Sequence, residues 1–459
     1  MMPVEVRPDA IPDEVRGLCR KLQQAGHGAW VVGGGLRDLL RGREPKDWDI
    51  ATAATPEQVT RLFRRVVPTG IAHGTVTVLQ AEGQYEVTTL RGEGHYSDGR
   101  RPDSVAFVQD IVEDLSRRDF TVNAIALDPA SGELIDPFGG LVDLQRQVLR
   151  TVGDPSARFG EDGLRVLRAA RFVATLQFSL AEATEAAIAG ALPVFAQVSA
   201  ERVRDEWMKA LAAAKPSLAF EVMRRTGILD VSCPDLVQLH GCPQNKYHAY
   251  DVWGHTMVCM DACIEHDPVH RLAGLFHDIG KPATRQLSDK TQDYTFYNHE
   301  RVGADMAQDW LKAYRFSKDE QRRVVHLVRH HLICYTPEWT DAAVRRFVRR
   351  TGREHLAQLL ALGRADAMAK GRPIADELAR LSELDRRVAA VEQAGVALST
   401  RDLAISGRDL MSELGLRPSP LIGRILEQLL EQVLDDPSRN EREVLLQGAR
   451  RLAEVGLER

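Results

Sequence analysis

The spacing of apolar positions divides the chain into two regions of different secondary structure. Before about residue 150, short Val- and Thr-rich runs alternate with polar and glycine-containing connections, a pattern typical of strands. These runs are AWVVGG, DIATAA, GTVTVLQ, YEVTTL and FTVNAIAL. From about Asp154 onward, Ala-, Leu-, Arg- and Glu-rich segments with helical periodicity replace them. The pattern predicts an α/β region with a mixed sheet, followed by a predominantly helical chain.

Proline and glycine clusters subdivide the helical part. The 459 residues are enough for about two to four domains, each with its own core. We expect boundaries near residues 150, 215 and 375, which define the segments 1–150, 151–215, 216–375 and 376–459. The expected fold class is therefore multidomain, with a mixed-sheet α/β head followed by all-α domains.

Composition excludes several classes of protein. No apolar run is long enough to cross a membrane as a helix, and the N-terminus lacks a signal-peptide pattern, so we expect a cytoplasmic protein. Six scattered cysteines lack paired zinc-type spacing and are expected to stay reduced. The net charge of −5 argues against binding nucleic acid through a global positive field, so RNA contacts must come from local arginine patches. These features do not determine the oligomeric state.

A glycine turn and a pair of aspartates form the first candidate site. Residues 30–38 (WVVGGGLRD) predict a strand, a glycine turn and a helix start, where backbone N–H groups can approach an anion. Such turns are also common structural features, so this one is weak evidence alone. Asp47 and Asp49 follow in the next strand-like run, and side chains two apart on a strand project from the same face. We expect the two carboxylates to point into one site.

A magnesium ion would explain why like charges are held together. Two close carboxylates repel unless a cation lies between them, and Mg²⁺ prefers carboxylate and phosphate oxygens as ligands. Glu86, in the run YEVTTL, can complete the cluster from a neighbouring strand. Three carboxylates around two Mg²⁺ ions suit nucleotidyl transfer, because the ions activate a 3′-hydroxyl and neutralise the leaving pyrophosphate. The alternative is that Asp47 and Asp49 only begin a surface turn.

The order of these motifs resembles the class II tRNA nucleotidyltransferase and bacterial poly(A) polymerase family, which has a polymerase β-like nucleotidyltransferase fold. The resemblance assigns catalysis and Mg²⁺ binding to Asp47 and Asp49, with Glu86 as the third carboxylate. A second motif, residues 117–124 (RRDFTVNA), is implied to bind the ribose and triphosphate, and arginine forks bind phosphate oxygens bidentately. The matched nucleotide-binding residues are Gly33, Gly34, Arg37, Arg117, Arg118, Asp119 and Asn123.

Three further segments resemble parts of this family. Residues 91–101 resemble its flexible loop, which is typically shortened in enzymes that add only CC and looks complete here. Residues 136–143 resemble its hinge motif, although the residues alone favour a helix-start turn. The C-terminal stretch, with residues 405–411 and 418–423, resembles its tRNA-binding tail, with Ser419 where the family often has glycine. That tail is expected to read the acceptor and T arms by shape.

Residues 159–171 (FGEDGLRVLRAAR) are expected to open the first long helix. Residues three apart share a helix face, so Asp162, Arg165 and Arg168 would form one polar stripe, with Arg171 continuing it. A carboxylate beside a guanidinium can read a base edge, and the resemblance assigns selection of the incoming base to Asp162 and Arg165. Cytosine and adenine both satisfy the pair, whereas uracil and guanine leave groups unpaired. The alternative is an Asp162–Arg165 salt bridge within the helix.

A second set of metal-ligand types lies in segment 216–375. His255, the adjacent His277 and Asp278, and Asp366 resemble the H…HD…D signature of HD-type phosphohydrolases. Imidazole with carboxylate suits a catalytic divalent transition metal, such as Ni²⁺, Mn²⁺ or Co²⁺, that keeps an open water position. Three histidines fall where some members of that superfamily bind a second metal: His299, His330 and His331.

Together these patterns predict a template-independent tRNA nucleotidyltransferase that builds or repairs the CCA end from CTP and ATP, with a phosphatase or 2′,3′-cyclic phosphodiesterase behind it. The four segments become a catalytic head, a neck with the base-selecting motif, an HD metal-binding domain and a tRNA-binding tail. An A-adding enzyme or a poly(A) polymerase is the alternative within the same fold. A hydrolase whose head only binds RNA is the alternative of another class.

Overall fold

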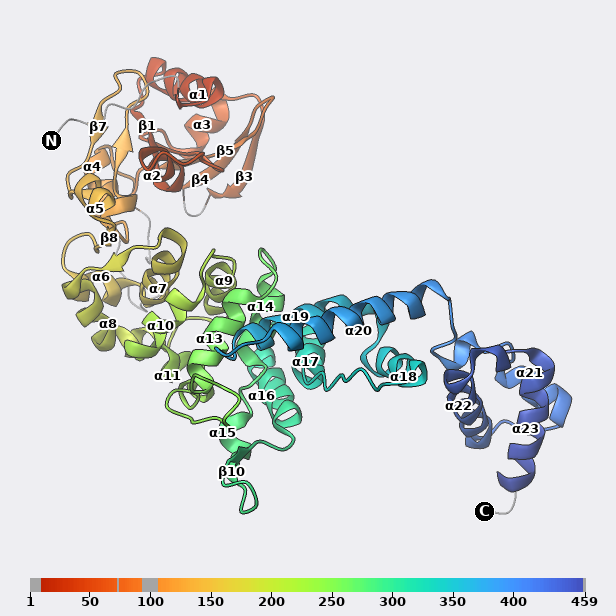
Figure 1. The fold of residues 1–459 in the computed structure, drawn as a ribbon. Helices are drawn as coiled ribbons and strands as arrows, with labels where there is room; N and C mark the ends of the chain where they lie inside the picture. Colours follow the sequence, from red (N-terminus) through yellow and green to blue (C-terminus); the bar gives the residue numbers. More distant parts are fainter. Residues whose placement is uncertain (1–9, 72–73, 93–105, 457–459) are drawn as a thin grey trace. The chain divides into compact units, whose positions relative to one another are not determined.

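The computed structural model describes residues 10–71, 74–92 and 106–456, and the chain divides into two compact units (Figure 1). The division falls between Val237 and Gln238. The first unit contains the large sheet, and the described part of the second is helical apart from one short hairpin. This architecture confirms the expected fold class. Among the described residues, none of the helices combines the length and apolar character needed to cross a bilayer.

A seven-stranded mixed sheet forms the centre of the first unit. The strand order is β3-β4-β5-β2-β1-β6-β7, and only β2 and β5 are paired in parallel. The strands are β1 (Ala29–Val32), β2 (Asp49–Thr52), β3 (Val66–Gly70), β4 (Thr75–Leu79), β5 (Gln84–Thr89), β6 (Ala126–Leu127) and β7 (Leu134–Ile135).

Four of the five predicted strand runs form strands, and the fifth departs from the prediction. The run FTVNAIAL forms a 3₁₀ turn over Thr121–Asn123 and contributes only the two residues of β6. The Asn123 side chain donates to Asp119 within this turn, at 3.0 Å. Side-chain hydrogen bonds of this local kind compete with strand pairing, so the run bends where the alternating pattern predicts an extended chain.

Amphipathic helices cover the sheet. Helix α1 (Asp13–Gln24) buries Val15, Leu18, Cys19 and Leu22, the spacing of one helical face, and contacts β1 and β2. A Thr55 capping box begins α3 (Pro56–Leu62), which contacts β4. The other helices of the head are α2 (Gly33–Leu40), α4 (Ile111–Ser116) and α5 (Gly140–Arg146).

Helices also form the rest of the first unit, around a buried α7. That helix contacts α9 and α10, and Trp207 and Phe220 from those two helices meet edge to face at 5.1 Å. The remaining elements are α6 (Pro155–Glu161), α7 (Leu164–Leu176), α8 (Glu182–Phe195), α9 (Ala200–Leu211), α10 (Ser217–Arg225), α11 (Ile228–Ser232), α12 (Pro234–Val237) and the strand pair β8 (Val148–Leu149) and β9 (Ser179–Leu180).

The expected first long helix is two helices. Helix α6 ends at Glu161, Asp162 is extended, and α7 begins at Leu164. The break has two causes. The Asp162 carboxylate accepts the Leu164 N–H at 3.0 Å, and the backbone at Gly163 passes so close to α8 that a Cβ there would lie 2.5 Å from the Phe195 nitrogen.

The second unit is built from helices α13 to α23. Helix α13 packs on α14 and α19, α14 on α17, and α17 on α16. The helices are α13 (Val252–Ala262), α14 (Pro268–Phe276), α15 (Lys281–Thr284), α16 (His299–Ala313), α17 (Lys318–His330), α18 (Asp341–Thr351), α19 (Leu356–Met368), α20 (Ala375–Gln393), α21 (Gly407–Leu414), α22 (Pro420–Asp435) and α23 (Arg442–Gly456). The hairpin joins β10 (Gln286–Leu287) to β11 (Tyr294–Thr295).

Candidate functional site

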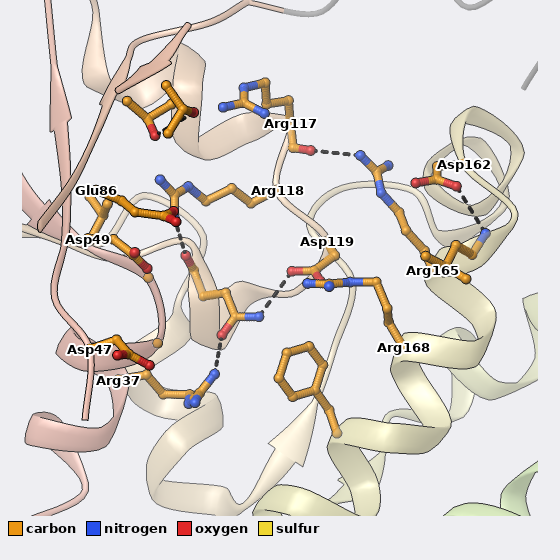
Figure 2. Close-up of a pocket in the computed structure, with 18 of the residues that line it drawn as sticks. Arg37, Asp47, Asp49, Glu86, Arg117, Arg118, Asp119, Asp162, Arg165 and Arg168 are labelled. Carbon is orange, nitrogen blue, oxygen red and sulfur yellow. Dashed lines mark hydrogen bonds and ion pairs between the residues drawn. The ribbon is translucent and has the colours of Figure 1, made fainter. Parts of the chain in front are cut away.

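Three carboxylates meet at the middle of the sheet (Figure 2). Asp49 begins β2 and lies directly opposite Glu86 of β5 in the parallel pairing. Asp47 precedes the strand, and all three side chains line one cavity of about 820 Å³. Asp47 therefore lies outside the strand that was expected to carry it, but it still faces the same cavity as Asp49.

The glycine turn sets how closely the aspartate loop approaches helix α2. Gly33 has φ +77°, and a Cβ there would lie 2.4 Å from a carboxylate oxygen of Asp49. A Cβ on Gly35 would lie 2.2 Å from the Asp47 carbonyl oxygen. The Gly34 N–H, at the start of α2, hydrogen-bonds the Asp49 carboxylate. The anion at this helix N-terminus is therefore the protein's own aspartate.

The electrostatics of the cluster favour a bound cation. Burial and the charge of Glu86 raise the pKa of Asp49, while Arg118 and the Gly34 amide act in the opposite direction. A half-buried carboxylate opposite a second one is unfavourable in the ionised form, and a divalent cation between them removes the repulsion. These three oxygen-donor side chains suit Mg²⁺.

A buried acid that the sequence reasoning missed holds the two arginines of the second motif. One oxygen of Asp114 accepts from Arg117 at 2.5 and 3.1 Å, and the other accepts from Arg118 at 3.1 and 3.3 Å. Asp114 also accepts the Arg91 N–H at 3.1 Å. Burial alone would raise the pKa of Asp114, but Arg117 and Arg118 lower it overall. The available signal was an acid three and four residues before an arginine pair on a helix.

A hydrogen-bonded chain connects the head to α7 (Figure 2). Arg37 donates to the Asn123 side chain at 2.8 Å, and Asn123 donates to Asp119 at 3.0 Å. Arg168, from α7, donates to the other oxygen of Asp119 at 2.5 and 2.9 Å. Burial raises the pKa of Asp119, but Arg168 and Asn123 outweigh it and bring that pKa to about 2. Four residues predicted to bind nucleotide therefore orient one another.

Asp162 and Arg165 line the cavity from the neck, each with a different partner. Asp162 accepts from Arg202 at 2.6 Å. Arg165 donates to Glu161 at 2.5 Å and to the Arg117 carbonyl at 3.0 Å. The alternative interpretation, an Asp162–Arg165 salt bridge within one helix, is therefore not observed, because Asp162 lies before the first turn of α7.

All the residues predicted for the first site line one cavity. They are Gly33, Gly34, Arg37, Asp47, Asp49, Glu86, Arg117, Arg118, Asp119, Asn123, Asp162, Arg165, Arg168 and Arg171. Three cationic residues of the wall were not predicted as site residues: Arg91, Arg202 and Lys209. No predicted motif contains Arg202 or Lys209. Arg91 begins the predicted flexible loop, and residues 93–101 of that loop lie outside the described residues.

Comparison with known proteins identifies the family. Three family models match: the poly A polymerase head domain at residues 29–150, a probable RNA- and SrmB-binding site of polymerase A at 177–239, and a putative tRNA nucleotidyltransferase domain 2 at 286–449. The CCA-adding enzyme of Enterococcus faecalis is 32% identical over 97% of this chain and 98% of that protein. The chain belongs to the CCA-adding enzyme family.

Solved structures agree with this assignment. The crystal structure of the Bacillus stearothermophilus CCA-adding enzyme in complex with CTP matches with a TM-score of 0.75 and 29% identity, over 100% of both chains. The CCA-adding enzyme of a Geobacillus species is 33% identical over 93% of this chain and 94% of that protein. The resemblance of the head motifs to a nucleotidyltransferase family is thus confirmed.

In the second unit, this member of the CCA-adding enzyme family has a cluster of metal-ligand side chains. One group contains His255, His277 and Asp366, and the other contains Asp278, His299 and His331. His255 Nε2 lies 3.1 Å from His277 Nε2 and 2.9 Å from an Asp366 oxygen.

Asp278 stands between the two groups. One of its oxygens lies 3.1 Å from His277 Nε2, and the other lies 3.4 Å from His299 Nε2. Burial opposes ionisation, but His277 and Lys281 hold the pKa of Asp278 well below its usual range. A carboxylate in this position can bridge two cations.

The histidine tautomers suit metal binding. A backbone carbonyl accepts from the Nδ1 of each histidine in the cluster: Ala369 at 3.1 Å for His255, and Gly274, Phe296 and Val328, each at 2.7 Å, for His277, His299 and His331. A carbonyl can only accept, so Nδ1 carries a proton in each ring and Nε2 is the nitrogen that faces the cluster.

His330 lies outside this cluster, although it was grouped with His299 and His331. Its ring stacks against His326 at 4.6 Å, and it lines two other cavities. His330 ends α17 and His331 follows it, so the two neighbouring side chains point in different directions.

The arginines at 345, 346 and 349, one of the local arginine patches considered for RNA contact, are already paired within the protein. Arg346 and Arg349 of α18 bind Glu431 of α22, and Arg345 donates to the Leu434 carbonyl at 2.6 Å. These contacts tie α18 to the C-terminal end of α22, where cations are favourable. Their charge is largely neutralised by that helix.

Proposed function

We propose that the chain is a template-independent tRNA nucleotidyltransferase that adds or repairs the 3′-terminal CCA of tRNA from CTP and ATP. The observation that carries this proposal is the cavity in which three carboxylates face an arginine-rich wall. The bound CTP of the matching Bacillus stearothermophilus enzyme supports a nucleotide in this place.

In this proposal, Asp47, Asp49 and Glu86 hold two Mg²⁺ ions. Their fit rests on the direct pairing of Asp49 with Glu86 and on the raised pKa of Asp49. Bound there, magnesium supplies Lewis-acid stabilisation of the triphosphate and lowers the pKa of the attacking 3′-hydroxyl. The carboxylates fix where those charges lie before the substrates arrive.

Arg117 and Arg118 bind the triphosphate, and Asp162 and Arg165 select the base. Asp114 presents both guanidinium groups from a buried position, so the phosphates meet donors that need little reorganisation. In this structure the Asp162 carboxylate accepts a hydrogen bond from Arg202. In this proposal, the amino group of the incoming C or A replaces Arg202 as the donor to Asp162 during base selection.

The RNA 3′ end approaches from the opposite side of the carboxylates. A second cavity, of about 740 Å³, shares Asp47, Asp49 and Glu86 with the first and adds Arg43, Lys46 and Trp48. Two cavities that share these carboxylates suit in-line attack on an α-phosphate, because the nucleophile and the leaving group must lie on opposite sides of the phosphorus.

The deciding experiment supplies single nucleotides to three tRNA transcripts: one lacking CCA, one lacking only the terminal A, and one complete. We expect CMP incorporation into the first, AMP incorporation into the second and no extension of the third. Exclusive use of ATP would indicate the A-adding alternative, and continued growth of the third transcript a poly(A) polymerase.

Conservative replacement of the central carboxylate tests the metal assignment. Asp49→Asn should lower incorporation of both nucleotides by about 100-fold or more, because a Mg²⁺ ligand worth several kcal/mol of charge stabilisation is lost. Incorporation at the wild-type rate by the Asp47→Asn, Asp49→Asn protein would contradict the assignment of the catalytic Mg²⁺ site to these carboxylates.

We also propose a second activity, metal-dependent hydrolysis of phosphate esters by the cluster around Asp278. The inward-facing Nε2 atoms of four histidines and the two aspartates support a divalent metal there, with Ni²⁺, Mn²⁺ or Co²⁺ as the expected ions. The substrates are expected to be phosphomonoesters or 2′,3′-cyclic phosphates at RNA 3′ ends. Failure to hydrolyse cyclic nucleotide with Ni²⁺, Mn²⁺, Co²⁺ or Mg²⁺ supplied would remove this activity.

We also propose a role for each of the four segments of the chain. We assign 1–150 to the catalytic head, 151–215 to the neck, 216–375 to the HD domain and 376–459 to a tail that binds the acceptor and T arms. The match of residues 286–449 to a putative tRNA nucleotidyltransferase domain supports a tRNA-related role for the last two segments.

A further inference from the structure

The metal-ligand cluster of the second unit opens into a cavity of about 350 Å³. Four members of the cluster line the cavity: Asp278, His299, His331 and Asp366. Its volume lies at the lower end of the range for small-ligand sites, roughly 300 to 1,000 Å³, and suits one nucleotide unit.

The lining of this cavity also contains aromatic residues. Tyr294, in β11, and Phe296 and Tyr297, which follow it, all line the cavity. The Phe296 ring faces the Lys281 ammonium at 5.5 Å, and the Tyr294 ring faces the Arg285 guanidinium at 5.4 Å. The Tyr297 side chain is 75% exposed, the highest exposure among the large hydrophobic residues of the described chain. A tyrosine ring left open beside a polar cluster has a face available to a planar ligand.

The aromatic segment is fixed relative to the cluster. The Phe296 carbonyl accepts the Nδ1 proton of His299 at 2.7 Å, so the backbone next to Tyr297 also orients a metal ligand. Asn298, between Tyr297 and His299, has φ +63°, which turns the chain sharply into α16. A ligand that stacks on Tyr297 would therefore lie at a fixed distance from the metal-ligand cluster.

Two lysines add positive charge to the lining of the cavity. Lys281 and Lys370 both line the cavity, and the Lys281 nitrogen lies 2.6 Å from an Asp278 oxygen. Lys370 pairs with Glu377 at 2.6 Å. Ammonium groups beside a metal-ligand cluster favour a phosphate ester over a neutral ligand.

We infer that this cavity is a nucleotide subsite, in which Tyr297 stacks on the base of the terminal nucleotide while its phosphate reaches the cluster. The inference rests on the proposed phosphohydrolase function and names its substrate class: esters that carry a nucleobase, in preference to base-free sugar phosphates. Stacking uses the π-face that every base has, so this site tolerates all four bases. In this respect it differs from the head cavity, which must select C and A by the hydrogen-bonding groups on the edges of the bases.

The test measures binding as well as turnover. Adenosine 3′-monophosphate and ribose 5-phosphate are titrated calorimetrically into the full-length protein without CTP, and the difference between wild type and Tyr297→Ala separates binding in this cavity from binding in the head cavity. We expect the nucleotide to bind about 5- to 100-fold more tightly than the sugar phosphate, the range that one base stacked on an aromatic ring supplies.

Tyr297→Ala should remove this preference and Tyr297→Phe should keep it. Tyr247→Ala, at a tyrosine that is 62% exposed but does not line the cavity, is the matched control and should bind like wild type.

The outcomes separate this inference from the hydrolase proposal. Equal affinity of the wild-type protein for the two esters, absence of binding by both, or an unchanged preference in Tyr297→Ala would each overturn the stacking role. Metal content, measured by mass spectrometry, should be the same in the wild type and the three variants. A protein that binds the nucleotide through Tyr297 but hydrolyses no ester with any supplied metal would retain the subsite and lose the enzyme.

Discussion

Asp114 shows how one buried side chain can control a site that it does not line. It fixes Arg117 and Arg118, and neither arginine has another side-chain carboxylate within hydrogen-bonding distance in the described chain. Charge-assisted hydrogen bonds of this kind are worth about 1.5 to 3 kcal/mol each. The position of the two arginines proposed to bind the triphosphate therefore depends on a residue in the helix before them.

Replacing this acid should weaken nucleotide use. In Asp114→Ala both guanidinium groups lose their anchor, so we expect kcat/KM for CTP and ATP to fall about 10- to 100-fold, mostly through KM. Steady-state incorporation into tRNA transcripts measures the effect. Glu113→Ala, which removes an exposed acid from the same helix, is the control. Equal KM values in the two variants would contradict the anchoring role.

Asp119 should give the first unit a pH-dependent stability. Its pKa of about 2 in the folded protein lies below its ordinary value of 3.8, so ionised Asp119 stabilises the fold above about pH 4 and this contribution is lost as the pH falls toward 2. A shift of about two units corresponds to roughly 2 kcal/mol. In urea unfolding, the stability lost in Asp119→Asn should be largest at neutral pH and should vanish near about pH 2. Loss of the same size at every pH would show that the buried hydrogen bonds, rather than the charge, matter.

Helix α2 can begin where it does only because its first turn lacks side chains on one face. Gly35 lies under the Asp47 carbonyl, where an added Cβ would come within 2.2 Å of a backbone atom. A backbone oxygen cannot rotate away as a side chain can, so the loop that carries Asp47 would have to move.

The smallest substitution at this position should therefore be costly. We expect Gly35→Ala to lower the unfolding free energy by about 1 to 3 kcal/mol, the cost of overpacking, and to reduce CMP incorporation more than its stability explains. Gly17→Ala on α1, where an added Cβ meets nothing within 4 Å, is the control and should stabilise by up to about 1 kcal/mol. A Gly35→Ala enzyme with normal turnover would contradict this reading of the turn.

The arginines of α18 hold this helix against α22, and we expect them to contribute little to RNA binding. Arg346 and Arg349 pair with Glu427, Glu431 and Asp435, but these pairs are partly exposed. Exposed pairs contribute only about 0.2 to 1 kcal/mol each, so the double alanine variant should lose about 1 kcal/mol, and less at high salt. Its tRNA affinity should stay within about twofold of wild type, because few phosphate contacts are removed. Filter binding at several salt concentrations would reveal a direct RNA role as a reduced salt slope.

The two candidate sites are each built within one unit. The transferase cavity uses residues 32–209, and the metal-ligand cluster uses residues 255–366. Neither site borrows a side chain from the other unit, so their chemistry should be separable.

Variants of each site should leave the other activity intact. His255→Ala should abolish transition-metal binding and ester hydrolysis, because it removes one of three ligands in its group, and should keep CMP incorporation within about twofold. Asp49→Asn should show the reverse. Parallel incorporation and hydrolysis assays on both proteins, with melting curves to establish folding, decide the matter. Loss of both activities in a folded His255→Ala protein would show that the sites are coupled.

Local patterns predicted much of this molecule correctly. The alternating runs located four strands, the carboxylates grouped as expected, and every predicted transferase residue lines one cavity. The errors have a common cause. The break after Glu161 depends partly on α8 passing next to Gly163, and the Asn123 side chain also accepts a hydrogen bond from Arg37, which is distant along the chain. Periodicity reports only on neighbours along the chain.

The amino-acid sequence by itself determined which side chains can carry chemistry. Carboxylates bind cations, arginines bind phosphates and histidines bind transition metals, whatever their position in the chain. Only the tertiary structure decided which of them meet. Strand pairing places Asp49 opposite Glu86. Asp114 is buried and binds both Arg117 and Arg118. His331, and not His330, points into the metal-ligand cluster. The physical reason is that electrostatic and metal-ligand interactions act over a few ångströms, and separation along the chain does not measure that distance.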